Sequence, residues 1–509
     1  MSAQLPPVLP IRPFTKPAKA RVRVPGSKSI TNRALAIGAL KNSMTVLGGA
    51  LKSRDTYIMQ QCLMTLGRKF GRIDVDSELN FTIREEYSEA KCLSDTSDEI
   101  GVLPLDGDVI FPNHKGVTLH VGNAGTAARF LTALLCLQPE GEFYVDGDEA
   151  MYRRPMKGLT DALESLGAQF TFHKTPGCIP FTLKTAPITK DYVEVDARES
   201  SQILSALLIM AAGLGRPFEV RLLGKTVSEP FVEMTAKMLH EDLGVNVSHS
   251  VGGIYRIEED TQRKGDLVNC AIEPDATAAS YFLSLPIATI SGGSCNVKYL
   301  QLCMWGRLQG DIAYFKVLEN VGLSLTNEDN SVRPHGPKDI RTSLPADVTP
   351  RCVTADFEAF SDTFLTLAAL TPLLEGKTRI SGIAHTRKQE TDRVAAMARE
   401  LKKLGQHVVE EEGALEVTPD LAAMKALARK AREDAANGLG NASGCIEIDT
   451  YHDHRFAMSF AILGCRDLLG DGKPWLAIRD PKCCGKTFPN FFDVLEDAWK
   501  QSHSESPAA

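Results

Sequence analysis

At five places along the chain, a run of apolar positions with a period of 3.6 residues ends at a glycine. A stretch of alternating apolar and polar positions follows each glycine, so each pattern predicts an amphipathic helix and then a strand. Glycine suits the residue just after a helix, where the backbone often turns left-handed. The five glycines are Gly67, Gly167, Gly244, Gly322 and Gly405, at spacings of 100, 77, 78 and 83 residues. These spacings predict an internal repeat.

A second element recurs upstream of these helix ends. It is a short polar cluster that runs into a helix of small and apolar residues, and such a helix belongs inside a core with its polar start at one edge. The six stretches are SKSITNRALAIGAL (27–40), GNAGTAARFLTALL (122–135), ESSQILSALLIMA (199–211), PDATAASYFLSL (274–285), FSDTFLTLAAL (360–370) and YHDHRFAMSFAILG (451–464). Six such units predict an α/β (α+β) protein of two domains with three units each. The buried helices of one domain would aim their positive ends at one cleft, which favours anions.

Three stretches break the pattern and are expected to be surface insertions. They cover residues 84–99, 327–350 and 427–444, and the last is expected to add a short exposed helix. None of the three is interpreted as functional.

The composition narrows the class of protein. With 509 residues, 43% hydrophobic and 24% charged, the chain is long enough for two or more ordinary globular domains. No apolar run approaches the roughly 18 residues that a membrane span needs, and the start lacks a signal core. A net charge of −7 without a basic stripe argues against nucleic-acid binding. Twelve cysteines without CxxC spacing fit a reduced, cytoplasmic setting, although a plastid stays open.

Two cations flank the start of the first buried helix. Lys28 and Arg33 lie where a helix already presents free N–H groups and a partial positive charge, so further cations are unfavourable unless an anion binds there. The segment is therefore either a tolerated surface start or a site for a strongly negative ligand.

Two motifs in the first half surround other helix starts. In GNAGTAARFL, Gly122 and Gly125 allow a close backbone approach and Thr126 can cap the helix, but a plain turn is the alternative. In MYRRPMKGL, Arg153 and Arg154 precede a proline that opens a helix, where paired arginines are usually solvated.

Three motifs in the second half carry more charge. In TRKQETDR, Glu390 and Arg393 are three residues apart, and a helical ion pair is the structural alternative to a site. The His-x-His arrangement in YHDHRF lacks a clear set of further metal ligands, so no metal is expected. DPKCCGKTF lacks the earlier glycine of a phosphate loop, so Lys486 alone remains a candidate phosphate contact.

Taken together, these motifs resemble the EPSP synthase family of enolpyruvyl transferases. The order PGSKSITNRAL, GNAGTAARFLTAL, RRPM, SSQILSALL, DATAASYF, LQGD, ETDR, YHDHRFAMSFA and DPKCCGKTFP follows that family from residue 24 to about residue 496. The resemblance implies two domains of three βαβαββ repeats. Residues 1–25 and 273–509 would form a discontinuous first domain and residues 26–272 a second, with the active site in the cleft between them.

The resemblance implies a transferase of the shikimate pathway, which leads to chorismate and the aromatic amino acids. Family members transfer the enolpyruvyl group of phosphoenolpyruvate (PEP) to the 5-hydroxyl of shikimate 3-phosphate and release phosphate. No cofactor is expected, because cationic side chains and helix ends can supply the field that this chemistry needs. The expected partners are these two anionic substrates, without nucleic acid or membrane, and the chain is expected to be a monomer that glyphosate inhibits.

The resemblance also assigns roles to individual residues. Asp362 would accept the hydroxyl proton, and Glu390 with Lys28 would serve protonation at the PEP methylene carbon, with their division of labour left open. The residues expected to bind phosphoshikimate are Lys28, Ser29, Arg33, Ser200, Ser201, Gln202, Ser228, Asp362, His385 and Gln389. The residues expected to bind PEP are Lys28, Asn123, Gly125, Arg154, Gln202, Arg393, Arg455 and Lys486. His454 is expected to support the geometry of Arg455.

Four positions depart from the pattern of many relatives. Gln389 stands where they have lysine, and it keeps a donor but loses the charge. His385 stands in place of an asparagine and can still donate a hydrogen bond. Phe231 replaces a tyrosine, and Phe130 replaces a proline.

Two other functions compete with this interpretation. A UDP-N-acetylglucosamine enolpyruvyl transferase would share the architecture, but it requires a Lys-Asn pair near the start and a reactive cysteine on a mobile loop, which aligns with the PEP loop GNAGTAARF of this chain. Here the pair is Lys28-Ser29, and GNAGTAARF has no cysteine. A non-catalytic ligand sensor on the same scaffold is suggested by Gln389, and turnover distinguishes it from an enzyme.

Overall fold

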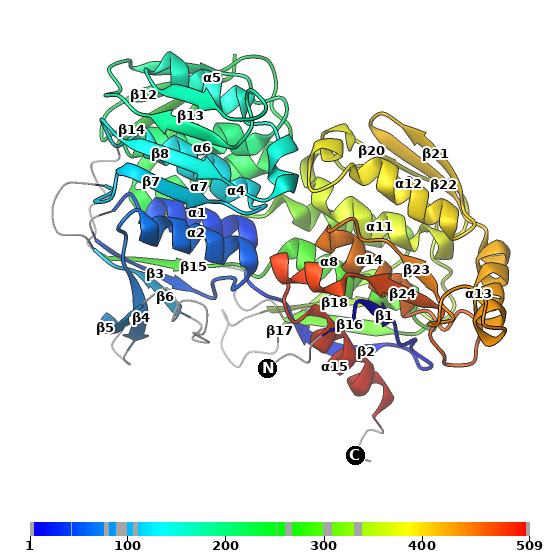
Figure 1. Cartoon of the computed structure of the whole chain (residues 1–509). Helices are drawn as coiled ribbons and strands as arrows, with labels where there is room; N and C mark the ends of the chain where they lie inside the picture. The colour runs from blue at the N-terminus through cyan, green and yellow to red at the C-terminus, as the bar shows by residue number, and fades with distance from the viewer. Residues whose placement is uncertain are drawn as a thin grey trace. The chain divides into compact units, whose positions relative to one another are not determined.

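The chain forms two compact units in a computed structural model, which describes residues 5–41, 43–75, 81–87, 99–104, 110–250, 252–259, 267–298, 308–329 and 338–504. Unit 1 consists of Met1–Pro25 and Pro274–Ala509, and unit 2 of Gly26–Glu273 (Figure 1). The chain therefore starts in unit 1, makes all of unit 2 and returns.

Unit 2 contains the predicted repeat in its plainest form. Its order is β7 (Lys115–His120), α4 (Gly125–Leu135), β8 (Glu142–Asp146), α5 (Lys157–Ser165), β9 (Gln169–Phe172) and β10 (Phe181–Lys184). Strands β7 and β8 are parallel, and β10 pairs antiparallel with both β8 and β9. Each repeat is thus a βαβαββ unit in which the first helix crosses between parallel strands.

The other two sheets of unit 2 follow the same plan. One contains β11 (Tyr192–Val195), α6 (Ser201–Ala212), β12 (Phe218–Leu222), α7 (Pro230–Leu243), β13 (Val245–Ser250) and β14 (Ile254–Glu259). The other contains α1 (Lys28–Gly38), β3 (Met44–Gly48), α2 (Arg54–Thr65), β4 (Phe70–Val75), β5 (Phe81–Glu86) and β6 (Glu99–Val102). In this second sheet, β15 (Leu267–Ala271) from the end of the unit takes the place of the first strand and pairs in parallel with β3. Strand β5 is an additional strand at the opposite edge.

Unit 1 completes its repeats with strands from the N-terminus. The first repeat pairs β2 (Lys19–Arg23) in parallel with β16 (Ser294–Lys298), and includes α8 (Ala276–Leu283), α9 (Leu285–Ala288), η2 (Gly310–Ala313), α10 (Tyr314–Val321), β17 (Ser324–Asp329) and β18 (Lys338–Ser343). The last repeat contains β23 (Ile446–Ile448), α14 (His454–Gly464), β24 (Leu476–Arg479), η6 (Pro481–Lys486) and α15 (Phe491–His503). There β1 (Val8–Pro10) pairs antiparallel with β24.

The middle repeat of unit 1 carries much of the candidate site. Its order is β19 (Thr354–Asp356), η3 (Glu358–Thr363), α11 (Phe364–Leu370), η4 (Thr371–Leu373), β20 (Thr378–Ser381), η5 (Ala384–Lys388), α12 (Arg393–Lys403), β21 (His407–Glu411) and β22 (Ala414–Thr418). Figure 1 shows α11 and α14 inside unit 1, with the strands and α12 outside them.

The local predictions about helices are confirmed. Every residue of α4 and of α14 is buried, as a helix that is apolar on all sides requires. The five helix-ending glycines all have left-handed backbones, with φ between 66° and 116°. Only glycine adopts that conformation without steric cost, which explains why the helical pattern stops there.

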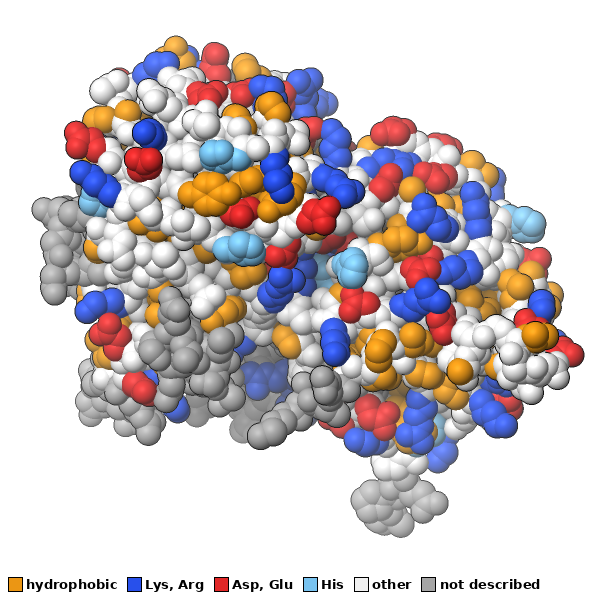
Figure 2. Space-filling model, in the orientation of Figure 1, with side chains coloured by type: hydrophobic (Ala, Val, Ile, Leu, Met, Phe, Trp, Pro, Cys, Tyr) orange, Lys and Arg blue, Asp and Glu red, His pale blue; other side chains and the backbone are white. Residues whose placement is uncertain are grey.

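The predicted insertions are partly described. Residues 88–98 and 330–337 lie outside the described residues. The first part of the third insertion, residues 427–436, belongs to α13 (Leu421–Ala436), which starts earlier than expected and buries only Met424 and Ala428. On the face in Figure 2, cationic and anionic side chains are interspersed over each unit.

Candidate active site

Arg393, the first residue of α12, binds three carboxylates. Its Nη1 donates to Asp362 Oδ1 (2.9 Å), its Nη2 to Glu390 Oε2 (2.9 Å) and its Nε to Asp453 Oδ2 (2.7 Å). Burial lowers the pKa of Arg393, but the charges of these acids raise it above its usual value. The guanidinium is therefore a permanent cation that joins η3, the turn before α12 and the start of α14.

Asp362 lies between two arginines. Its Oδ2 accepts a hydrogen bond from Arg455 Nη2 at 2.6 Å, in addition to the bond from Arg393 to its other oxygen. Burial lowers the pKa of Arg455, but the charges of the groups around it, first among them Asp362, together raise it above its usual value. The two arginines hold the carboxylate in place. Because 21% of the Asp362 side chain remains exposed, a small molecule can still reach it.

Glu390 is also held by two cations. Lys486 Nζ in η6 donates to its Oε1 at 2.8 Å, and Arg393 donates to its Oε2. The Glu390 side chain is only 8% exposed. Glu390 precedes α12, so its contact with Arg393 is a buried ion pair before the helix, unlike the helical pair that the spacing alone suggested.

Two of the departures from the family pattern lie beside this cluster. His385 in η5 shares a hydrogen bond between its Nε2 and Ser361 Oγ at 2.8 Å, and burial lowers its pKa. A neutral imidazole is therefore expected at neutral pH next to Asp362. The amide oxygen of Gln389 accepts a hydrogen bond from Arg393 Nη1, which leaves the amide N–H groups as donors.

The two histidines of YHDHRF do not face a common point. His454 is fully buried in α14, whereas the side chain of His452 is 91% exposed and its Nδ1 is 2.9 Å from Asp480 Oδ2. In the described part of the chain, no group of three or more His, Cys, Asp or Glu side chains could hold a metal ion.

Sequence reasoning gave no role to two acids of this cluster, Asp453 and Asp311. Asp453 is fully buried and caps α14 by accepting from the backbone N–H of Arg455 at 3.0 Å, while it also binds Arg393. One carboxylate therefore holds the guanidinium of Arg393 and the backbone of Arg455. The signal in the sequence was its position directly before an otherwise apolar helix, where aspartate is a preferred cap.

Asp311, in the LQGD motif, is the second such acid. It is 4% exposed in η2, and its Oδ1 has no hydrogen-bond partner among the described residues. Burial, and then the charge of Asp362, raises the pKa of Asp311 to about 8, although the nearby Arg455 acts in the opposite direction. The acid is therefore largely protonated at neutral pH.

We expect Asp311→Asn to change the pH dependence of stability. An aspartate whose pKa is about 4 when unfolded and about 8 when folded binds a proton on folding, so its contribution is complete below about pH 4 and lost as pH rises towards 8. The asparagine variant should gain stability relative to wild type between pH 5 and pH 8. Urea unfolding at several pH values measures this difference, and a difference that does not change with pH would contradict the expectation.

In unit 2, Lys28 and Arg33 have different surroundings. Lys28 Nζ lies 3.5 Å from Asp55 Oδ2, and the first turn of α1 contains no acid. Arg33 is 1% exposed, and it donates to Thr235 Oγ1 (2.7 Å), to Ser205 Oγ (3.2 Å) and to the backbone oxygens of Ser29 and Phe231 (both 3.0 Å). Burial lowers the pKa of Arg33 to about 9. A negative ligand near α1 would offset this cost of burial.

The two substituted phenylalanines flank Arg33. Its Cζ lies 5.3 Å from the ring centroid of Phe130 and 5.8 Å from that of Phe231. Both distances fall within the range of cation–π attraction. The two residues that depart from the family pattern, Phe130 and Phe231, thus place apolar rings beside the buried Arg33.

The GNAGTAARFL motif forms a second cationic group in unit 2. Arg154 Nη1 donates to the backbone oxygen and to Oδ1 of Asn123 (3.2 and 3.3 Å), and a Cβ on Gly125 would lie 2.5 Å from Arg154 Nη2. Arg129 Nη1 donates to Gln202 Oε1 at 2.9 Å. The missing side chain of Gly125 thus lets Arg154 approach the start of α4.

The serines expected to bind phosphoshikimate lie at helix starts. Ser200 caps α6, accepting from the backbone N–H of Gln202 at 3.3 Å, and Ser201 is the first residue of that helix. Ser228 precedes α7 and has a left-handed backbone, with φ of 50°. Helix starts present backbone N–H groups that suit anions.

The predicted residues thus form local clusters within each unit. Unit 1 brings together Asp362, His385, Gln389, Glu390, Arg393, Arg455 and Lys486, and unit 2 contains Lys28, Ser29, Arg33, Asn123, Gly125, Arg154, Ser200, Ser201, Gln202 and Ser228. The arrangement in unit 1 places two carboxylates among three cations, which suits proton transfer beside a bound anion.

Comparison with known proteins identifies the family. Residues 14–495 match the family model of EPSP synthase (3-phosphoshikimate 1-carboxyvinyltransferase). The chain belongs to the EPSP synthase family. It is 44% identical to a 3-phosphoshikimate 1-carboxyvinyltransferase of Opitutus terrae over 491 residues, covering 96% of this chain and 97% of that protein. A chloroplastic 3-phosphoshikimate 1-carboxyvinyltransferase of Nicotiana tabacum is 32% identical, covering 97% of this chain and 86% of that protein.

Solved structures agree on the fold. An EPSP synthase from Acinetobacter baumannii matches with a TM-score of 0.68 at 21% identity, covering 96% of this chain and 98% of that one. The enolpyruvyl transferase NikO from Streptomyces tendae matches with a TM-score of 0.61 at 14% identity, covering 96% and 97%. The expected two-domain enolpyruvyl transferase fold is therefore confirmed. None of the helices that the structure describes is long and apolar enough to cross a membrane.

Proposed function

We propose that this chain transfers the enolpyruvyl group of PEP to the 5-hydroxyl of shikimate 3-phosphate, giving 5-enolpyruvylshikimate 3-phosphate and phosphate. Membership of the EPSP synthase family supports this reaction. The observation that carries it is the pair Asp362 and Glu390, two carboxylates held by the same arginine with one further cation each.

The reaction consists of an addition, which needs two proton transfers, and an elimination, which takes a proton back from the methyl group. As the 5-oxygen bonds to C2 of PEP, its proton passes to Asp362, and the methylene carbon gains a proton from Glu390 or Lys28 to become a methyl group. Loss of a methyl proton, back to Glu390 or Lys28, then expels phosphate and restores the double bond, and the departing phosphate takes up the proton held by Asp362. No cofactor or metal enters this proposal, because the surrounding cations stabilise the charge that develops.

The binding roles follow the two clusters. We assign PEP to Lys28, Asn123, Gly125, Arg154, Gln202, Arg393, Arg455 and Lys486. We assign shikimate 3-phosphate to Lys28, Ser29, Arg33, Ser200, Ser201, Gln202, Ser228, Asp362, His385 and Gln389. The proposal requires both units to contribute to one active site, and it includes a monomer that acts in the cytoplasm and that glyphosate inhibits.

Phosphate release tests the function. Purified protein should release phosphate only when PEP and shikimate 3-phosphate are both present, because neither substrate alone supplies both the leaving group and the attacking hydroxyl. UDP-N-acetylglucosamine in place of shikimate 3-phosphate serves as the control acceptor. Release with that acceptor, or binding of both substrates without any release, would contradict the proposal.

We expect Gly125→Ala to weaken PEP binding. The added Cβ would lie 2.5 Å from Arg154 Nη2 and 2.7 Å from Arg129 Nη1, so both guanidinium groups must move while the backbone remains in place. The KM for PEP should rise about 10-fold or more, and inhibition by glyphosate should weaken with it. The KM for shikimate 3-phosphate should change little.

Gly48→Ala is the matched control for this change. Gly48 lies at the end of β3, and a Cβ there meets no atom within 4 Å. That variant should behave like wild type in both KM values. A Gly125→Ala enzyme with the wild-type KM for PEP would remove this position from the binding site.

A further inference from the structure

The turn that leads into α14 has an unusual backbone. Tyr451 and His452 both have left-handed conformations, with φ of 55° and 56°, and the backbone N–H of Asp453 donates to the Thr450 oxygen at 2.8 Å. Asn and Gly are the usual residues in a turn with two left-handed central positions. A tyrosine and a histidine adopt this conformation at a cost, so other contacts must hold the turn.

The strongest of these contacts is made by Tyr451. Its hydroxyl donates to Glu400 Oε1 at 2.6 Å, and Glu400 is fully buried in α12. Glu400 Oε2 also accepts from the backbone N–H of Asp449 (3.2 Å) and lies 2.7 Å from Lys403 Nζ. Burial, together with this hydrogen bond, raises the pKa of Tyr451 to about 12, so the hydroxyl remains a donor throughout the neutral range.

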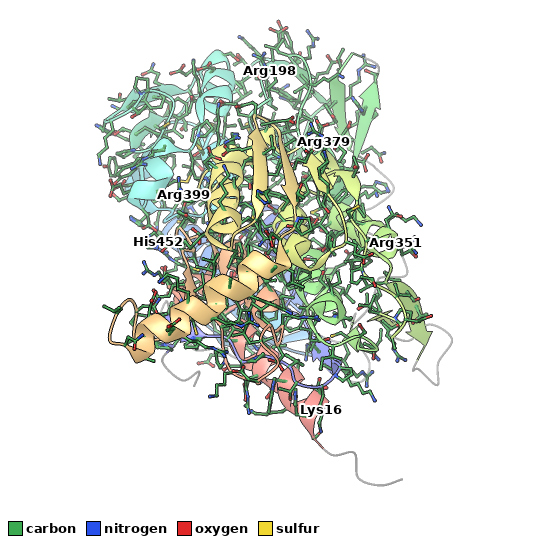
Figure 3. All side chains as sticks on the ribbon, turned by 90° about the vertical axis from the view of Figure 1, so that its right-hand side faces the viewer. Lys16, Arg198, Arg351, Arg379, Arg399 and His452 are labelled. Carbon is green, nitrogen blue, oxygen red and sulfur yellow. The ribbon has the colours of Figure 1, made fainter. Side chains whose placement is uncertain are left out.

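The ring of Tyr451 contacts side chains of both helices. It packs edge-on against Phe456 in the first turn of α14, with ring centroids 5.6 Å apart. On α12, the Cζ of Arg399 lies 5.4 Å from its centroid. Figure 3 shows Arg399 and His452 on the same side of unit 1. The side chain therefore joins the middle of α12, seven residues after Arg393, to the turn just before α14.

Both helices begin at residues of the candidate site. Asp453 follows the turn directly and binds the backbone N–H of Arg455 and the Nε of Arg393. Arg455 in turn donates to Asp362 Oδ2 at 2.6 Å. If the turn relaxed to an ordinary backbone, Asp453 would leave both arginines and Arg455 would no longer be aimed at Asp362.

We propose that Tyr451 is a positioning residue for the reaction: its hydrogen bond to Glu400 holds the left-handed turn at Tyr451 and His452, and this turn aims Arg455 at Asp362. The inference rests on the function proposed above. Tyr451 contacts no reacting atom and acts through Asp453 and Arg455.

Tyr451→Phe tests the hydrogen bond to Glu400, because it removes the hydroxyl and keeps the ring. We expect kcat/KM for PEP to fall about 10-fold, because a hydrogen bond to a charged acceptor is lost. The loss can appear as a higher KM for PEP or as a lower kcat. The KM for shikimate 3-phosphate should stay within about twofold, since the residues assigned to that substrate lie mainly in unit 2.

Tyr314→Phe is the matched control. Tyr314 is fully buried in unit 1, and its hydroxyl lies 3.0 Å from Ser284 Oγ, far along the chain from the turn. This variant should lower the thermal midpoint without changing the KM for PEP. If Tyr451→Phe has wild-type kinetics, or loses stability without a selective effect on PEP, Tyr451 is a purely structural residue and the proposal is wrong.

A pair of substitutions at His452 tests the backbone separately. The side chain is 91% exposed, so His452→Gly and His452→Val both lose the contact with Asp480 without disturbing a core. Glycine favours positive φ and a β-branched residue resists it. His452→Gly should stay within about twofold of wild type, whereas His452→Val should lose about 10-fold in kcat/KM for PEP.

Equal kinetics of the two His452 variants would overturn the proposal, and this pair decides the question if Tyr451→Phe does not fold. The wild-type protein is assayed first. Absence of turnover in wild type would overturn the proposed function, whereas normal turnover in wild type, Tyr451→Phe and both His452 variants would overturn only the role of the turn.

Discussion

Replacing Asp362 with asparagine should lower kcat by about 100- to 10,000-fold, the usual cost of losing one acid–base group. An amide is close to the size of the carboxylate but cannot accept the proton of the attacking hydroxyl. The KM for shikimate 3-phosphate should change little, because an amide still hydrogen-bonds a hydroxyl. Steady-state kinetics with both substrates measures the two effects separately.

The same change also removes a charge between two arginines. Asp362 accepts from Arg393 and Arg455, and the oxygen of an amide serves only one of them well. The thermal midpoint of Asp362→Asn should therefore fall, and kinetics should be measured well below it.

Asp356→Asn is the control for Asp362→Asn. Asp356 ends β19, just before the element that carries Asp362, and accepts from the backbone N–H of Glu358 at 2.9 Å outside the cationic cluster. An Asp362→Asn enzyme as active as this control would show that Asp362 is structural.

Replacing Glu390 with glutamine should lower kcat by a similar factor, about 100- to 10,000-fold. The carboxylate is 8% exposed and bound by Arg393 and Lys486, so it is placed to exchange a proton with a neighbouring anion. PEP affinity should stay within a modest factor, because both cations remain to bind it. Single-turnover measurements would separate the slower chemistry from binding.

Glu447→Gln provides the comparison for Glu390→Gln. Glu447 is 11% exposed and its Oε2 accepts from Arg479 Nε at 2.7 Å, so it is a partly buried acid of the same unit outside the cluster. Loss of that ion pair should affect stability alone. If Glu390→Gln keeps wild-type turnover, its contact with Arg393 is only a structural ion pair, and Glu390 has no part in the mechanism.

The sequence was sufficient for the repeat. The six buried helices and the five left-handed glycines were predictable, because apolar periodicity and glycine preference depend on residues close together in the chain. The order of motifs likewise predicted the family that the comparisons then identified. Residue types at helix starts also indicated which side chains belong to a site for anions.

The tertiary structure decided how those side chains pair. Asp362 is 31 residues from Arg393 and 93 residues from Arg455, and no local pattern says which acid meets which base. The sequence permitted a helical pair of Glu390 and Arg393, whereas packing placed Glu390 before the helix and gave it Lys486 as well.

Strand exchange was also decided by packing. Strands β2, β1 and β15 complete sheets whose other strands lie far away in sequence, because the chain crosses between the units twice. In the same way, the left-handed turn at Tyr451 and His452 contradicts local preference and is held by Glu400 from another helix. Local sequence thus determined the elements and their buried faces, and long-range contacts determined the ion pairs, the borrowed strands and the strained turn, since these depend on which elements pack together.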